Sequence, residues 1–263
     1  MIIGGVICLA LSAVALYFFF DARGTLQAAQ KSETLTCGEI DELSQAAAEA
    51  VGAGSFSHAC EVAGVAVGAE HGPLHAPESG VECIWHRSTV TEHYWDWERD
   101  SDGDRRRVRK ERQLSSHASE TAFIVDDGTG KIPVDPRGAD IDGEEKVVDR
   151  MEDADDGRSG GGSGFASLVA NLGQSLMGGD STIALEYEEW VIRSGARVYA
   201  LGEVRDDGGR VRLAKPAKGK MIISTRSEEE VTGSARKTMT LAAVGAGVLD
   251  LAGIGLIVAG LLA

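Results

Sequence analysis

Two apolar stretches, one at each end of the chain, enclose a middle that carries nearly all of the charge. Residues 1–20 contain no acidic or basic side chain, and residues 241–263 contain only Asp250. A helix of about 20 apolar residues crosses the roughly 30 Å hydrocarbon core of a bilayer. The pattern therefore predicts two transmembrane helices, at residues 1–20 and 241–263, which bind the chain to a lipid bilayer as an integral membrane protein.

A cleaved signal peptide is the alternative for the first stretch. Such a peptide has a basic start, a shorter apolar run and a cleavage site of small residues. Here no Lys or Arg precedes the apolar run, which ends directly at Asp21. An uncleaved anchor is therefore the better interpretation.

The second stretch combines small residues with one carboxyl group. Gly253 and Gly255 keep parts of the helix thin, so that another helix can approach closely. Asp250 is either protonated or bonded to a neighbouring helix, or it belongs to a proton or ion path. A path needs several polar partners, and the first stretch offers only Ser12 and Tyr17. We therefore favour the first interpretation.

The basic residues nearest to both stretches lie on the side of the middle, and the opposite ends carry none. They are Arg23, Lys31, Arg226, Arg236 and Lys237. The positive-inside rule then places the middle in the cytoplasm and both termini outside. Arginine is used more than lysine, and alanine and glycine are abundant, as is typical of a prokaryotic protein. We therefore expect the plasma membrane of a prokaryote.

The middle begins with a helical pattern. Apolar residues recur at helical spacing, and glycines follow them as a stop signal. These residues are Ile40, Leu43, Ala47 and Val51. We expect residues 21–55 to form a membrane-proximal helical segment.

From residue 56 onward, short β-branched or aromatic runs alternate with turn residues, which is typical of strands. Residues 126–130, Asp-Asp-Gly-Thr-Gly, carry a hairpin turn signal. Residues 56–238 are therefore expected to form a β-rich domain. Alternation along its strands predicts buried positions at Trp85, Phe123, Val125, Trp190, Val198 and Leu201.

One part of this domain breaks the strand pattern. Residues 140–164 are acidic at first and then rich in Gly and Ser, which predicts a flexible insert. Residues 165–177 can form a short helix. The fold class expected is α+β: a β-rich, partly open, antiparallel, barrel-like soluble domain with short helices, flanked by two transmembrane helices.

One dense basic run stands out in a chain of formal net charge −15. It consists of Arg105, Arg106, Arg107, Arg109, Lys110 and Arg112, and aspartates precede it. This mixed charge is typical of a solvated hairpin tip. A contact of the first four arginines with anionic lipid headgroups is a second interpretation, favoured by the nearby membrane. Nucleic acid, the third, is opposed by the net charge, because phosphate binding needs a basic face.

Several histidines and cysteines lie close together in the sequence and suggest zinc. They are His58, Cys60, His71, His75, Cys83 and His86. The paired spacing of zinc ligands is missing, and strand alternation puts Cys83 and Trp85 on one face and His86 on the other. We expect a buried Cys83, exposed histidines, and no metal or cofactor. No hydrolase, metalloprotease or P-loop motif occurs, so no catalytic residue is assigned.

Three ordered blocks of the middle resemble the GIDE domain, also called "beside a membrane". The first block is Pro73-Leu74, Pro77, Gly80 and Cys83-Ile84-Trp85. The second is Phe123 to Asp127, Gly130 and Val134-Asp135-Pro136. The third is Tyr187-Glu188-Glu189, Ile192, Gly195 and Val198 to Val204. The resemblance covers roughly residues 60–230, between the two predicted membrane helices.

The resemblance implies a relative of the membrane domain of MULAN-type mitochondrial ubiquitin ligases, in which a RING finger follows the second helix. A RING finger holds two zinc ions with about eight Cys and His ligands. Here Cys37, Cys60 and Cys83 form no C-x₂-C pair, and the sequence stops at Ala263. We therefore expect a non-catalytic, doubly anchored interaction or scaffold module with an unknown protein partner. The alternative is a RING-type ubiquitin ligase-like protein.

Overall fold

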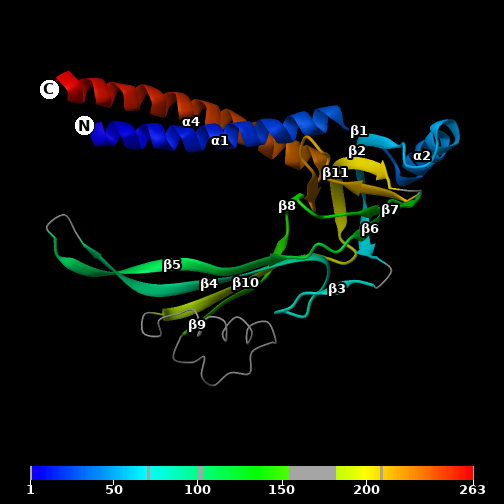
Figure 1. Cartoon of the computed structure of the whole chain (residues 1–263), viewed down its shortest axis with the longest axis horizontal. Coiled ribbons are helices and arrows are strands. Elements are labelled where there is room, and N and C mark those ends of the chain that lie inside the picture. The colour runs from blue at the N-terminus through cyan, green and yellow to red at the C-terminus, as the bar shows by residue number, and fades with distance from the viewer. Residues whose placement is uncertain (1, 70–71, 100–102, 154–181, 208–209, 263) are drawn as a thin grey trace.

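The computed structural model describes residues 2–69, 72–99, 103–153, 182–207 and 210–262 (Figure 1). Its helices are α1 (Ile2–Lys31), α2 (Cys37–Val51) and α4 (Glu228–Leu262). The helix predicted at 165–177 and the Gly/Ser-rich part of the predicted insert, from residue 154, lie outside the described residues.

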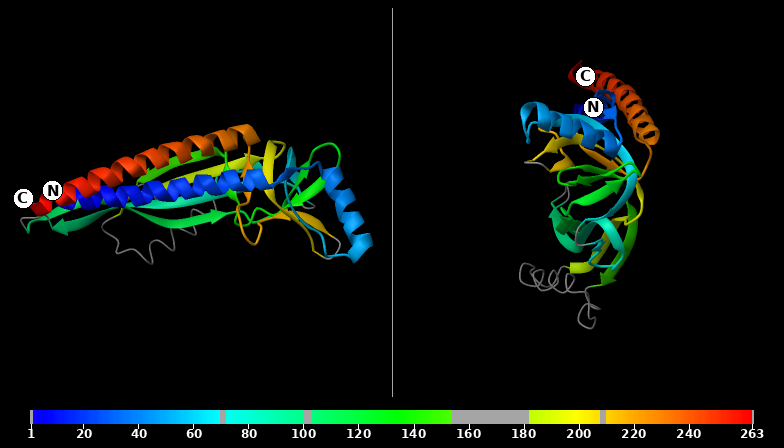
Figure 2. Two further views of the ribbon diagram at one scale, coloured as in Figure 1. Left: turned by 90° about the horizontal axis from the view of Figure 1, so that it is seen from above. Right: turned by 90° about the vertical axis from the view of Figure 1, so that its right-hand side faces the viewer.

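Helices α1 and α4 are both long and apolar enough to cross a membrane. They pack side by side and antiparallel, with the two chain ends together (Figures 1 and 2). Both helices extend beyond the predicted spans, since α1 continues past Phe20 to Lys31 and α4 begins at Glu228. The reason lies in packing: Ala22 and Leu26 of α1 are buried against Ala235 of α4. The two helices therefore stay paired outside the apolar segments.

Glycine allows the closest approach of the two helices. A side chain at Gly5 would place its Cβ 2.7 Å from the carbonyl oxygen of Gly253, so only glycine fits. Nearby, the Ser12 hydroxyl donates to the Ala246 carbonyl at 3.4 Å. Asp250 is half-buried on α4 and forms no hydrogen bond or ion pair with the described residues. The predicted bond from Asp250 to a neighbouring helix is therefore not formed.

The larger sheet closes into a barrel that is open along one seam. Strands β2, β6, β7, β12 and β11 follow one another, and β11 also pairs with β2. The seam lies between β12 and β7, whose parallel strand pairing is limited to Leu213 and Val134. The strands of the larger sheet are β1 (Glu33–Thr34), β2 (Ser57–Gly68), β6 (Phe123–Asp126), β7 (Lys131–Val134), β8 (Asp140–Asp142), β11 (Arg197–Asp206), β12 (Val211–Ala214) and β13 (Ile222–Ser224). The predicted fold class is confirmed.

The second sheet extends from the barrel as a long curved ribbon. Its order is β3-β4-β10-β9, and β5 pairs with β4. The strands are β3 (Leu74–His75), β4 (Glu82–Arg99), β5 (Arg105–Ala118), β9 (Glu145–Asp153) and β10 (Thr182–Arg193). The β4–β5 hairpin extends from the barrel in the same direction as α1 and α4, toward the end where the chain termini lie (Figure 1). The basic run predicted at a hairpin tip thus lies within strand β5.

The first part of the predicted flexible insert is ordered as strands. Residues 140–153 form β8 and β9, and β9 pairs with β10 from Val191 to Ala184. Val147 and Val148 pack against two small apolar clusters. The acidic composition suggested a linker, but apolar contacts of these valines and pairing with β10 fix the segment in the sheet.

Helix α2 forms where the sequence predicts a helix, but it buries a different stripe. Ile40 is 2% exposed, whereas Leu43 is 44% and Val51 73% exposed. The N-terminus has a capping box, in which the Thr36 side chain accepts from the Glu39 amide and the Glu39 carboxylate bonds back to Thr36. The helix is therefore held at its first turn, and its C-terminal half points away from the barrel.

The main core lies inside the barrel and continues to the base of the second sheet. Trp85, Phe123, Val125 and Val198 belong to it, as predicted. Leu201 is also buried, but in a separate cluster on the outside of the barrel. That cluster joins β11 and β13 to α1 and α4 through Tyr199, Leu201, Ile222, Val231, Ala28 and Ala29.

The predicted burial of Trp190 is wrong. Its ring is half-buried on the surface of the second sheet, with the Arg87 guanidinium 4.6 Å and the Lys146 ammonium 5.4 Å from the ring centre. Glu189 is the residue that points inward at this place, with no exposed surface. Along β10, Tyr187, Glu189 and Val191 are buried, so Trp190 belongs to the other face of the strand.

Replacing Trp85 by Ala should lower the free energy of unfolding by about 3–5 kcal/mol, since the site is buried and its neighbours cannot fill the cavity. Trp97→Ala is the matched control, because Trp97 is 63% exposed. Chemical unfolding of the full chain in detergent, followed by circular dichroism of the strands, measures both. Equal losses in the two variants would contradict the assigned core.

Candidate functional site

Three acidic residues of the GIDE resemblance blocks bind other parts of the domain. Glu189 lies on β10 facing the loop before β4. Its carboxylate accepts hydrogen bonds from the Glu78 and Ser79 amides, both at 2.9 Å, and from the Ser88 hydroxyl at 3.0 Å. The Ser79 hydroxyl donates to it as well. Glu189 of the third block thus fastens the Pro77–Gly80 loop of the first block to the sheet.

Asp127 joins the β6–β7 turn to helix α2. One carboxylate oxygen accepts from the Cys37 amide, in the first turn of the helix, at 2.7 Å. The other oxygen accepts from the Thr129 and Gly130 amides inside the turn. Burial opposes ionisation, but these amide donors outweigh it and lower the pKa of Asp127 to about 2. The ionised Asp127 carboxylate therefore links the turn to the helix through hydrogen bonds.

Asp135 is fixed by arginine at the barrel seam. The Arg137 guanidinium donates to both carboxylate oxygens, and Arg212 lies 3.7 Å away. These contacts, led by the Arg137 hydrogen bonds, hold the pKa of Asp135 below its usual range. The second block is thus bound within the domain as well, through Asp127 and Asp135.

The histidines and cysteines that suggested zinc are not brought together. Cys60 lies in the barrel core, whereas Cys83 lies in another cluster with Val191. His86 is half-buried beside His117, and His71 is outside the described residues. Burial raises the pKa of the Cys60 thiol to about 12 and that of Cys83 to about 11. Such thiols stay protonated at neutral pH and are poor nucleophiles.

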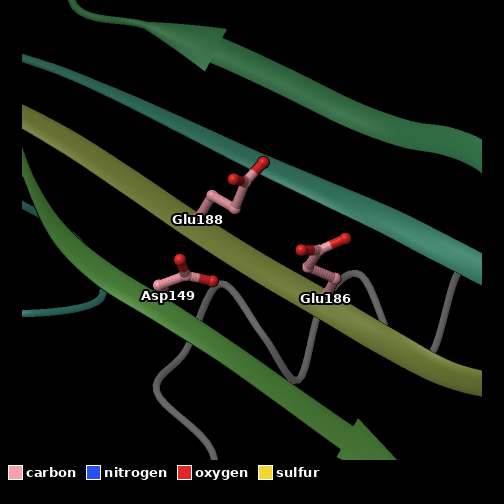
Figure 3. A group of neighbouring side chains, drawn as sticks. All are labelled: Asp149, Glu186 and Glu188. Atoms are coloured by element: carbon pink, nitrogen blue, oxygen red, sulfur yellow. The ribbon is translucent and has the colours of Figure 1, made fainter.

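Within the described parts of the chain, one group of side chains has the spacing to share a metal ion: Asp149, Glu186 and Glu188 (Figure 3). The Lys146 ammonium already lies 2.7 Å from Asp149 and 2.6 Å from Glu188. Glu186 is engaged by His93 at 2.9 Å. The carboxylates of this acidic group therefore already have Lys146 and His93 of the same chain as partners. Sequence reasoning missed it, although alternate glutamates on one strand were a usable signal.

A second unpredicted feature lies where the helices meet the domain. A cavity of about 450 Å³ opens there between α1, α4 and β8. The Lys220 ammonium in it lies 2.5 Å from Asp21 of α1 and 3.2 Å from Asp140 of β8. Burial alone would lower the pKa of Lys220, but the two carboxylates raise it on balance. Lys220 therefore ties the end of the membrane helix to the barrel.

The basic run divides into two parts along β5. Lys110 and Arg112, nearer the base of the hairpin, pair with Asp96, Glu98 and Glu92 of β4. The residues nearer the tip, Arg105, Arg106, Arg107 and Arg109, are exposed. None of these four forms an ion pair with a described residue.

These features define a β-barrel domain associated with a membrane through two apolar helices. The model of one protein family, described as E3 Ubiquitin ligase, matches residues 93–258, which is more than half of the chain. The chain belongs to this GIDE family, a family of ubiquitin ligase-related membrane proteins, and the predicted resemblance is confirmed. Comparisons with curated proteins and with solved structures gave no significant match.

Replacing Glu189 by Ala should lower the free energy of unfolding by about 1–3 kcal/mol, because several hydrogen-bond donors lose their acceptor. Glu188→Ala, at the neighbouring half-exposed position, should have a smaller effect. Thermal unfolding of both full-length variants in detergent tests this. A Glu189 variant as stable as the Glu188 variant would show that the loop does not depend on this carboxylate.

Proposed function

We propose that this chain is a doubly anchored, non-catalytic interaction module. Its helices hold a barrel and a long β-hairpin at a membrane surface, where they are available to a protein partner and to lipid. This proposal rests on what the carboxylates of the three GIDE resemblance blocks bind. Glu189, Asp127 and Asp135 all bind groups within the domain, at a loop, a helix end and a strand seam.

The cysteines support the same conclusion. Cys37, Cys60 and Cys83 are buried in apolar clusters, and Cys8 lies in the apolar part of α1. A RING finger would need about eight exposed or loop-borne Cys and His ligands in paired spacing. The burial of these cysteines therefore supports a role in packing rather than in zinc binding.

The second candidate function is a RING-type ubiquitin ligase-like activity, which only the family description favours. We expect the purified full chain to form no ubiquitin conjugates with activating and conjugating enzymes, and to hold no stoichiometric zinc. A known RING ligase in the same assay is the control. Conjugates that require this chain would overturn the non-catalytic proposal.

We further propose that the domain lies on the cytoplasmic side of a prokaryotic plasma membrane. The support is the positive-inside rule, because Arg23, Lys31 and Arg236 all lie on the domain side of the apolar segments. Arg23 and Lys31 belong to the turns of α1 that continue toward the barrel. Basic residues in such short flanks are the ones that count in this rule.

A single new cysteine tests this orientation. Ser55 is exposed after α2, and the wild-type chain is the matched control because its three domain cysteines are buried. We expect a membrane-impermeant maleimide to label Ser55→Cys only after the cells are lysed. Labelling of intact cells would place the domain outside.

A further inference from the structure

The outer half of the β4–β5 hairpin has one face made of tryptophan and arginine. In an antiparallel pair, directly opposed residues project to the same face, and every second residue shares it. The register pairs Trp95 with Arg109, Trp97 with Arg107, and Arg99 with Arg105. We refer to these six residues as the tryptophan–arginine face: Trp95, Trp97, Arg99, Arg105, Arg107 and Arg109.

The opposite face of the same segment has a different composition. It carries Asp96, Glu98, Arg106 and Lys110, and the Lys110 ammonium lies 2.8 Å from Asp96 and 2.9 Å from Glu98. The six residues of the tryptophan–arginine face include no acidic residue, and its arginines form no ion pair with the residues that the structure describes. The next position along this face is Glu111, opposite His93. The outer part of this face therefore carries a net positive charge, whereas acidic and basic residues balance on the opposite face.

The two tryptophans of this face are too exposed to be part of the core. Trp95 is 38% and Trp97 63% exposed, and the Arg107 guanidinium lies 5.0 Å from the centre of the Trp95 ring. Exposed aromatic groups of this kind mark contact surfaces. Tryptophan is enriched at the headgroup level of membranes, and arginine binds phosphate through its planar fork. The pairing of the two residue types fits a phospholipid headgroup.

The hairpin and the two apolar helices extend from the barrel in the same direction. In Figure 1, β4 and β5 run toward the end where the chain termini lie, as α1 and α4 do. With the apolar parts of α1 and α4 in the hydrocarbon, charged residues of the hairpin cannot enter that layer at low cost. The headgroup layer is therefore the part of the membrane that suits these residues, because aromatic rings and guanidinium groups are both stabilised there.

We propose that the tryptophan–arginine face binds the anionic phospholipid headgroups of the membrane in which α1 and α4 are anchored. The rings of Trp95 and Trp97 lie at the interface, and the arginines bind lipid phosphates. This inference rests on the proposed membrane anchoring and names a ligand for it. The formal net charge of −15 would repel an anionic surface elsewhere on the chain, so the attraction is local to this face.

The test uses the full chain in nanodiscs of zwitterionic lipid, with or without phosphatidylglycerol, and brominated lipid as a quencher of tryptophan fluorescence. Wild-type protein should show additional quenching when the anionic lipid is present, and high salt should reduce it. Arg107→Gln with Arg109→Gln should lose most of this quenching, through a change on the order of tenfold in the bound-to-free ratio of the hairpin.

Arg106→Gln with Lys110→Gln is the matched control, since it removes the same charge from the opposite face of the same strand. This control should keep the anionic-lipid effect. Equal losses in both double variants, or no effect of phosphatidylglycerol, would overturn the proposal. Tight binding of a single-stranded RNA oligonucleotide that Arg107→Gln with Arg109→Gln abolishes would assign the face to nucleic acid instead. Stable incorporation into nanodiscs reports on anchoring separately, so its failure is distinguished from failure of the lipid contact.

Discussion

The antiparallel packing of α1 and α4 sets the conditions for the rest of the structure, because it returns both ends of the soluble part to one place. The helices approach most closely at Gly5 and Gly253, where added side chains would meet backbone. Above the apolar segments they remain paired through Ala22 and Ala235. The barrel is thus attached to the helices, which cover the outside of β11 and β13. A chain held at both ends in this way has little freedom to tilt away from the membrane.

Buried carboxylates add hydrogen bonds between distant segments to the apolar contacts that hold the domain together. Glu61, Glu92 and Glu189 are each almost fully buried, and each has hydrogen-bond donors from a distant part of the chain. Glu61, for example, receives the Tyr199 hydroxyl at 2.6 Å and the Thr34 hydroxyl at 2.7 Å. A buried charge is costly unless its partners are in place, so such groups favour one arrangement of strands over alternatives. In this family domain, acidic residues thus act as cross-links between segments.

Elements with a strong local signal could be predicted from the sequence, and elements decided by distant contacts could not. The apolar ends, the turn at 126–130 and the presence of α2 follow from composition and spacing. The order at 140–153 depends on pairing with β10, and the burial of Glu189 instead of Trp190 depends on hydrogen-bond donors of the 77–80 loop, neither of which leaves a local pattern. Lys220 was missed because its partners Asp21 and Asp140 are brought to it only by the fold.

Among the described strands, β5 pairs only with β4, and charge along its other edge prevents association with further strands. Protection of the edge does not by itself explain how the charges of the hairpin are distributed. It requires charged side chains along the strand, but it does not require acidic and basic side chains to be divided between the two faces. Here Lys110 is paired on one face, whereas Arg107 and Arg109 on the other face form no ion pair with a described residue and lie beside Trp95. The separation of charge by face, together with the exposed rings, therefore favours a surface that binds a ligand over one that only keeps the strand soluble.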